Sequence, residues 1–445
     1  MQNDKAKIGK GIDASLIGLY LLLVGIGITA IFAVTYREGD PVMSSFLSFK
    51  TDYSKQFYFF VIALFIGIFI LLTDSKFFPA TANLWYAVGI VLLLLVFPFH
   101  SNVKGTESII RFGGFQFQPA EFCKVCVCLA LAKYLSRVDT DFTKTRSQLI
   151  AAGIAVTPAL ITIMQKETGL ALVYFSFFLV MYREGLPAIV LIVGFSIAAL
   201  VIATLVIEPN TLAIILTATA GLVAYLNRRQ IKRRKSVLFT IVLLWLLCVG
   251  VQRFAVPFIF QHVLQKHQVE RIFSLFGKDN PYSGLPAELE SATAAKKEAT
   301  SDYNVRQSKI AIGSGGVLGK GLLNGTQTRY DFVPEQRTDF IFCTIGEGFG
   351  FVGTSILLSI YLILLFRIVA VAERQRSVFS RCYAYGVAAV FFFHIAINVC
   401  MTVGLAPVIG IPLPFVSYGG TALLTFTILL FILIRLDADR QMVLR

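Results

Sequence analysis

Long runs of apolar residues, separated by short polar stretches, dominate the pattern along this chain of 445 residues. A helix needs about 20 predominantly apolar residues to cross the hydrocarbon core of a bilayer, and we also count runs of about 15. The pattern predicts twelve transmembrane helices and hence an all-α polytopic membrane protein. The runs cover residues 14–35, 56–72, 84–97, 119–135, 149–164, 169–182, 187–207, 211–226, 236–250, 340–368, 381–403 and 413–434.

The composition indicates the same class. Hydrophobic residues make up 56% of the chain and charged residues only 15%, with a mean hydropathy of +0.74. Soluble domains carry about 25% charged residues. We therefore interpret residues 1–445 as one integral membrane domain, in which the largest polar stretch, residues 253–339, forms a long loop outside the membrane.

Basic residues in the short loops predict the orientation of the chain. With twelve spans these loops all fall on one side, so both termini are expected to be cytoplasmic and the loop 253–339 extracytoplasmic. The net charge of +14 follows from this bias. Because the basic residues are scattered rather than gathered on one module, no nucleic acid partner is expected. The residues concerned are Lys5, Lys7, Lys10, Arg137, Lys144, Arg146, Arg228, Arg229, Lys232, Arg233, Arg234, Lys235, Arg374, Arg376 and Arg381.

Two charged residues fall at the beginning of one apolar run. In the stretch QPAEFCKV, Glu121 and Lys124 are spaced i, i+3, so they share one face of a helix. A pair that neutralises itself near the membrane interface would account for them. Charged groups within a span also commonly face a polar cavity and mark a functional path. The sequence leaves both interpretations open.

A stretch towards the C-terminus is rich in proline and glycine at membrane depth. Residues 398–424 contain three prolines and four glycines. Such a density breaks helices, and broken helices are tolerated only where protein or water satisfies the backbone. We predict a re-entrant or kinked segment that lines a cavity, a device that transporters also use.

The polar stretch 303–353 is rich in glycine as well. Its segment IGSGGVLGKG, at residues 312–321, contains five glycines and Lys320. Backbone N–H groups in such a segment can approach an anion closely, with the lysine as a point charge. The spacing is not that of a nucleotide-binding P-loop, and an ordinary glycine-rich loop is the alternative.

Together these motifs resemble those of the SEDS family (shape, elongation, division and sporulation). The matching stretches are QPAEFCK, YNVRQSKIAIGSGG, GKGLLNGTQT, FVPEQRTDFIF, GEGFGFVG and NVCMTVGLAPVIGIPLPFVSYGGT. The resemblance implies a core of ten spans, so that residues 187–250 would contain an extra helical hairpin. It also implies a bacterial cytoplasmic (inner) membrane, with residues 253–339 as a periplasmic catalytic loop. The amino-acid sequences of these motifs are similar to the forms found in Bacteroidetes-type bacteria.

The resemblance further implies an activity. Members of this family act as peptidoglycan glycosyltransferases that polymerise lipid II into glycan strands, in cell-wall elongation and rod shape. MurNAc would be transferred with inversion from a polyprenyl diphosphate to the 4-hydroxyl of GlcNAc. The implied cofactor is Mg²⁺ or another divalent cation, and the implied partner is a class B penicillin-binding protein, a transpeptidase.

Site residues follow from the same resemblance. Relatives carry an essential aspartate shortly before the QSKIAIGSGG stretch; Asp279 matches this position best, and Asp302 is the runner-up because the loop is longer here. The added residues 285–301 are polar and are expected to lie outside the reaction centre. Where relatives commonly read QPDLGT, this chain has Lys166 and Glu167. The residues expected to bind substrate are Glu121, Lys124, Arg306, Gln307, Ser308, Lys309, Lys320, Arg337 and Ser417.

Two other classes of function fit parts of the pattern. A lipid II flippase would use the broken helices and the Glu121/Lys124 pair without needing an outer carboxylate. A scaffold that recruits cell-wall synthases would need neither feature. Replacement of the outer aspartate, with folding and partner binding monitored, separates the enzyme from both.

Overall fold

The computed structural model describes residues 11–440, except residues 38, 40, 48, 104–105, 113–114, 264–268 and 270–302. The chain divides into two compact units. Unit 1 comprises Met1–Leu186 together with Asn304–Arg445, and unit 2 comprises Pro187–Tyr303. All of the described motif residues named above lie in unit 1, apart from Tyr303 at the boundary.

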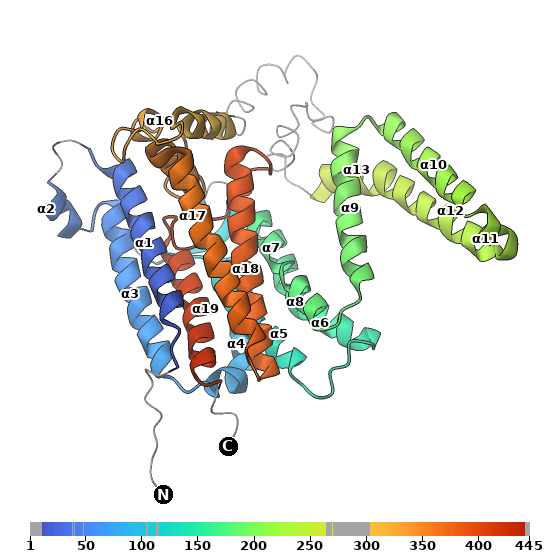
Figure 1. The fold of residues 1–445 in the computed structure, drawn as a ribbon, viewed down its shortest axis with the longest axis horizontal. Coiled ribbons are helices and arrows are strands. Elements are labelled where there is room, and N and C mark those ends of the chain that lie inside the picture. Colours follow the sequence, from blue (N-terminus) through green and yellow to red (C-terminus); the bar gives the residue numbers. More distant parts are fainter. Residues whose placement is uncertain are drawn as a thin grey trace, which may run out of the picture. The chain divides into compact units, whose positions relative to one another are not determined.

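Unit 1 is a bundle of helices, in which α1 begins at the same end as α19 finishes (Figure 1). A Cβ on Gly11 would lie 2.6 Å from the carbonyl oxygen of Ala438, so the two chain segments touch there. Residues 303–314 are also helical. The helices are α1 (Ala14–Thr35), α2 (Val42–Leu47), α3 (Asp52–Leu72), α4 (Phe77–Phe99), α5 (Pro119–Leu135), α6 (Thr145–Met164), α7 (Thr168–Tyr174), α8 (Phe177–Arg183), α16 (Thr326–Arg329), α17 (Ile341–Glu373), α18 (Val378–Val403) and α19 (Gly420–Ala438).

The core of unit 1 forms around α19, which packs against α3, α5 and α18. In the most apolar 18-residue stretch of each helix, 72% of the residues of α19 are buried, against 22% of those of α3 and of α4. Aromatic side chains meet in this interior: the ring of Tyr20 contacts Phe415 and Phe431 edge to face, at centroid distances of 5.0 and 5.4 Å. The outer helices keep apolar side chains on their exposed faces, as lipid requires.

Local sequence explains several helix ends. Asp13 caps α1 by accepting a hydrogen bond from the N–H of Leu16. Pro119 begins α5, where a missing N–H costs nothing. Gly404 ends α18 in the left-handed region (φ 77°), and the N–H of Leu405 then bonds the carbonyl of Cys400 at 2.7 Å.

A small sheet between α4 and α5 was not expected from the apolar pattern. Its antiparallel strands β1 (Ser101–Val103), β2 (Thr106–Phe112) and β3 (Phe115–Phe117) lie in that order. Strands this short give no clear alternation between two long apolar helices. The architecture is therefore all-α apart from this sheet in the part of the chain that the structure describes.

Unit 2 consists of helices with largely exposed apolar side chains. In the most apolar 18-residue stretch, only 11% of the residues of α9 and 6% of those of α10 are buried. This is expected for helices in contact with lipid. Its elements are α9 (Ala188–Val206), α10 (Pro209–Leu226), α11 (Arg228–Arg233), α12 (Lys235–Gly250), η2 (Val251–Ala255), α13 (Val256–Phe258) and η3 (Ile259–Val263), of which η2 and η3 are π-helical.

The polytopic helical fold is confirmed, whereas the count of twelve spans is not. Among the described residues, ten helices are long and apolar enough to cross a membrane. The expected span 119–135 is α5, with 17 residues, and 169–182 is divided between α7 and α8, with 7 residues each. The span expected at 413–434 begins only at Gly420, because residues 404–419 are not helical.

Candidate functional site

The glycine-rich segment 312–321 packs against the beginning of α17. The N–H groups of Lys320 and Gly321 donate to the carbonyl oxygens of Glu347 and Gly348, at 3.0 and 2.9 Å. A Cβ on Gly319 would lie 2.2 Å from the carbonyl oxygen of Gly348. Glycine is therefore needed here for the close approach of two backbone segments, and these N–H groups are not free to bind an anion.

The same approach bends α17. Gly350 has φ 65° and ψ −160° inside the helix, a left-handed φ that favours glycine. A Cβ at Gly350 would lie 2.4 Å from the backbone nitrogen of Gly319. The kink therefore separates the first turns of α17, which hold polar groups, from its long apolar part.

Glu347 is the centre of those polar groups. Its side chain is fully buried, and Oε1 accepts hydrogen bonds from Lys320 Nζ at 2.8 Å and from the N–H of Gln327 at 2.9 Å. Oε2 accepts from the N–H and the hydroxyl of Thr328, both at 2.8 Å. One ammonium group and several dipoles thus compensate the carboxylate, and together they fix the GTQT stretch in position.

A second buried carboxylate, Glu121, lies in the first turn of α5. Lys124 Nζ lies 2.6 Å from Glu121 Oε2 and 2.8 Å from His394 Nε2 on α18. All three side chains are buried, and the ammonium also lies 5.1 Å from the ring centroid of Phe426. Because an ammonium group only donates, Nε2 accepts and Nδ1 carries the imidazole proton towards the carbonyl of Pro412, 3.1 Å away. The pair that the i, i+3 spacing indicated is therefore part of a network that reaches the segment 404–419.

The segment 404–419 is not helical, and several of its backbone carbonyl groups accept hydrogen bonds from side chains instead. Phe415 even has φ 66°, an uncommon conformation for a bulky residue, while its side chain is buried. The side-chain donors and the carbonyl oxygens that they reach are Asn398 to Ile411, Tyr361 to Pro414 and Gln56 to Ser417, at 2.7, 2.6 and 3.2 Å. The predicted interruption of the helices is observed, and a cavity at this segment stays a prediction.

Ser417 ties this segment to the polar stretch before α17. Its hydroxyl donates to the carbonyl of Thr338 at 2.6 Å and accepts the N–H of Leu413 at 2.8 Å. The neighbouring N–H of Tyr418 donates to the carbonyl of Arg337 at 2.8 Å. Ser417 is buried, and its bonds within the chain give it a structural task beside its predicted role.

Arg337 lies between two carboxylates. Its guanidinium is 2.7 Å from Asp52 Oδ2 and 3.5 Å from Asp331 Oδ1, and Arg37 also reaches Asp331 at 2.8 Å. Burial alone would lower the pKa of Arg337, but the hydrogen bond with Asp52 and the charges of both aspartates raise it above its usual value. The described residues therefore already compensate the charge of Arg337.

The helical residues 303–314 carry charges that are not compensated in this way. Ser308 anchors the helix to α18 through a hydrogen bond of 2.9 Å to the carbonyl of Thr402. Arg306 and Lys309 are exposed, with half-buried Gln307 beside them. Within residues 11–263 and 303–440, neither cation has an ion-pair partner. This helix follows directly after the stretch that contains both candidate aspartates.

The departures at residues 166 and 167 are each bound to β2. Lys166 pairs with Glu107, and this hydrogen bond holds the pKa of Glu107 below its usual range. Glu167 is buried and accepts a hydrogen bond from the hydroxyl of Ser108 at 2.8 Å. The two residues therefore connect the turn before α7 to the small sheet.

Both candidate bases, Asp279 and Asp302, lie outside the described residues, as does the added stretch 285–301. Their roles stay predictions. Among the residues that the structure describes, no group of three or more His, Cys, Asp or Glu side chains could hold a metal ion. The expected divalent cation stays a prediction.

The fold and these polar groups define a polytopic membrane protein with a buried charge network and a glycine-packed polar stretch at one end of its bundle. The chain belongs to the family described as "Cell cycle protein", whose name combines FtsW, RodA and SpoVE; the match covers residues 13–233 and 235–442.

Two relatives are called peptidoglycan glycosyltransferases. MrdB of Escherichia coli K12 is 30% identical over 384 residues, which cover 85% of this chain and 84% of that protein. RodA of Treponema pallidum is 29% identical over 452 residues, which cover 96% and 97%. The crystal structure of Thermus thermophilus RodA matches with a TM-score of 0.60 at 21% identity, over 97% of this chain and 98% of that one. This likeness shows the fold.

Sequence reasoning did not find several residues of the site. His394, the third member of the Lys124 network, has no nearby partner in sequence, since 270 residues separate it from Lys124. Glu347 appeared only within the matched stretch GEGFGFVG, and Gln56 was not identified as a polar partner. A carboxylate between glycines at the start of an apolar run was the one available signal for Glu347.

Proposed function

We propose that this protein is a peptidoglycan glycosyltransferase that polymerises lipid II in the bacterial inner membrane, with cytoplasmic termini and a periplasmic loop 253–339. The observation that carries the proposal is the family match over nearly the whole chain, with relatives named for this activity. A solved peptidoglycan synthase complex contains a chain of similar fold, with a TM-score of 0.64. A class B penicillin-binding protein is the proposed partner on this ground.

The proposed reaction is a single displacement. The 4-hydroxyl of the acceptor GlcNAc attacks C1 of the donor MurNAc and gives its proton to Asp279, while the bond from C1 to the diphosphate oxygen breaks with inversion. A positioned base of this kind contributes about 10²–10⁴ in rate. Asp302 is the alternative base. Fixed positive charge must stabilise the departing diphosphate.

The structure separates the basic candidates into two kinds. Lys320 is neutralised by Glu347 and Arg337 by its aspartates. Arg306 and Lys309, by contrast, are exposed on the helix that follows the stretch with the two candidate aspartates. We assign the diphosphate contacts to Arg306 and Lys309. A divalent cation stays part of the proposal, and no step here depends on it.

The test is polymerisation of lipid II by the purified full chain, with and without its transpeptidase. We expect Asp279→Asn to remain folded and to bind the partner, but to lose about 10²–10⁴ in rate. Asp139→Asn, in an exposed loop, is the matched control. Full activity of Asp279→Asn together with loss in Asp302→Asn would transfer the role to Asp302. Wild-type protein that moves lipid II across vesicles without making polymer would favour the flippase instead.

A second arm tests the two cations. Arg306→Gln and Lys309→Gln should each lower kcat/KM about tenfold, as expected for loss of one charge-assisted contact to phosphate. Lys50→Gln, which removes another exposed cation before α3, should change little. Equal effects of all three variants would mean that general surface charge, rather than a diphosphate site, is measured.

A further inference from the structure

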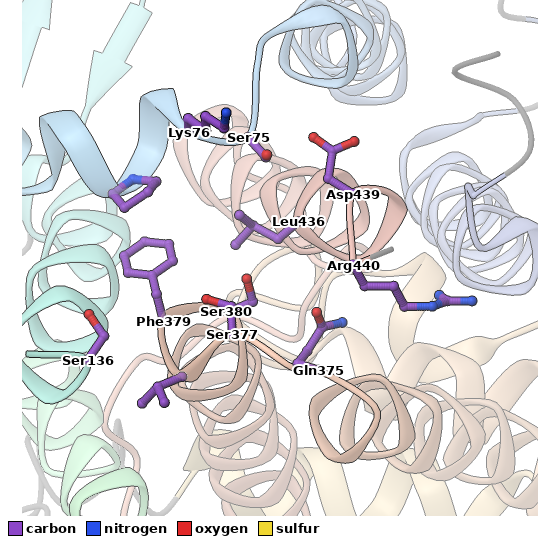
Figure 2. Close-up of a pocket in the computed structure, with 12 residues that line it drawn as sticks. Ser75, Lys76, Ser136, Gln375, Ser377, Phe379, Ser380, Leu436, Asp439 and Arg440 are labelled. Carbon is purple, nitrogen blue, oxygen red and sulfur yellow. The ribbon is translucent and has the colours of Figure 1, made fainter. Parts of the chain in front are cut away.

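A cavity of about 360 Å³ opens where α1 begins and α19 ends, away from the glycine-packed stretch. Four parts of unit 1 line it: the turn between α3 and α4, the end of α5, the turn between α17 and α18, and the end of α19. Its volume lies within the range of small-molecule sites, about 300–1,000 Å³. Figure 2 shows that polar side chains from all four parts surround it.

The start of α18 provides hydrogen-bond donors to this cavity. The first N–H groups of a helix have no acceptor within it, and they carry the positive end of its dipole. Ser377, at the N-cap of this 26-residue helix, makes no capping bond with its side chain. Ser380 is only 7% exposed and lines the cavity (Figure 2). The described residues include no hydrogen-bond partner for the Ser380 hydroxyl, so a buried donor is available there.

Positive charge is in excess around the cavity. Lys76 lines it and is exposed, without an ion-pair partner in the described part of the chain. The carboxylate of Asp439, which also lines it, is paired with Arg435 at 2.7 Å. Arg440 joins a network through Asp437. The lining charges and their direct ion-pair partners comprise three cations and two carboxylates: Lys76, Arg435, Arg440, Asp437 and Asp439.

Apolar side chains complete one wall of the cavity. Pro79, Phe379 and Leu436 lie beside the polar groups, and the positive-inside pattern predicts that this end of unit 1 faces the cytoplasm. We propose that the cavity binds a phosphate group, held by Lys76, Ser380 and the start of α18. The phosphate could belong to the head group of an anionic membrane lipid or to a soluble phosphate compound; the recognition chemistry is the same.

The experiment titrates the full chain in detergent with three probes: dihexanoyl-phosphatidylglycerol, inorganic phosphate and dihexanoyl-phosphatidylcholine. Binding is followed by ³¹P NMR line broadening. We expect saturable binding of the phosphatidylglycerol or of the phosphate, and about tenfold weaker binding in Lys76→Gln and in Ser380→Ala, since each loses one contact to the anion. Tighter binding of the phosphatidylglycerol indicates a lipid source, and tighter binding of the phosphate a soluble one.

Lys144→Gln is the matched control, because Lys144 is an exposed cation of another loop expected on the same side. Ser380→Ala removes no hydrogen bond of the described structure, so it should fold, which size-exclusion chromatography checks. Three results overturn the proposal: no saturable binding of either anion, equal weakening in Lys144→Gln and Lys76→Gln, or equally tight binding of the zwitterionic phosphatidylcholine.

Discussion

Two glutamate–lysine pairs of unit 1 contain a buried glutamate, and they are built differently. In α5, Lys124 is completely buried, and among the described residues its ammonium contacts the polar groups of Glu121 and His394 and the ring of Phe426. At the start of α17, Lys320 is 27% exposed, and Glu347 keeps backbone and hydroxyl donors in addition to it. The first pair consists of mutually dependent charges. In the second pair, backbone and hydroxyl groups already donate hydrogen bonds to the carboxylate, and the lysine adds one more.

The largest effect is expected where the charges depend on each other. Lys124→Gln or Glu121→Gln leaves one buried charge uncompensated, which should destabilise the protein by about 3–5 kcal/mol. The swap Glu121→Lys with Lys124→Glu restores a pair and should recover much of this loss. Thermal unfolding and the folded yield in detergent measure both. Similar stability of the single variants and the swap would show that the two charges do not rely on each other.

At the second pair the two partners should behave unequally. Glu347→Gln places an amide NH₂ against N–H and hydroxyl donors, so unsatisfied buried groups should cost about 1–3 kcal/mol. Lys320→Gln removes a partly exposed ion pair and should cost less than about 1 kcal/mol. The measurement is the unfolding temperature, together with protease resistance of residues 320–328. Equal losses would make this pair resemble the one in α5 and remove the contrast.

Asp13 extends the comparison to a carboxylate at the membrane face, with a smaller and pH-dependent effect. Burial would raise its pKa, but hydrogen bonds from Ser15, Arg367 and Arg374 outweigh burial and lower the pKa from 3.8 to about 2. Because the folded pKa is depressed, the stabilisation is fully present above about pH 4 and is lost as the pH falls towards 2; it amounts to about 2 kcal/mol.

The measurement is unfolding as a function of pH for wild type and Asp13→Asn. The variant should be less stable near pH 7, and the two curves should converge at low pH. Parallel curves between pH 2 and 5 would contradict the depressed pKa.

The sequence contained the local parts of this site and lacked the distant ones. The spacing of Glu121 and Lys124 predicted a shared helix face, and the prolines and glycines after residue 398 predicted interrupted helices. His394 and Gln56 could not be predicted as partners, because their contacts depend on how helices far apart in sequence pack. The glycines of residues 312–321 were open to two interpretations, since a backbone that approaches an anion and one that approaches another backbone both need to lack a side chain.

The hydropathy pattern explains why the count of twelve spans was not confirmed. Hydropathy registers apolar content, so it joined residues 413–419 to α19 and counted residues 169–182 as one span. The structure interrupts the first where Tyr361 of α17 and Gln56 of α3 donate hydrogen bonds to the backbone carbonyls of Pro414 and Ser417. It interrupts the second at the turn between α7 and α8. Such contacts have no counterpart in the local pattern of apolar residues.

The central position of α19 has a consequence for biosynthesis. Synthesis proceeds from the N-terminus, so α19 is made after α3, α5 and α18, the helices that surround it. Those helices enter the membrane before the faces that contact α19 are covered. The space between them must stay accessible until α19 inserts. The bundle can therefore close only late, when a helix translated after its neighbours moves in between them. A ribosome that stalls before residue 420 would release a membrane protein without its centre rather than one without its edge.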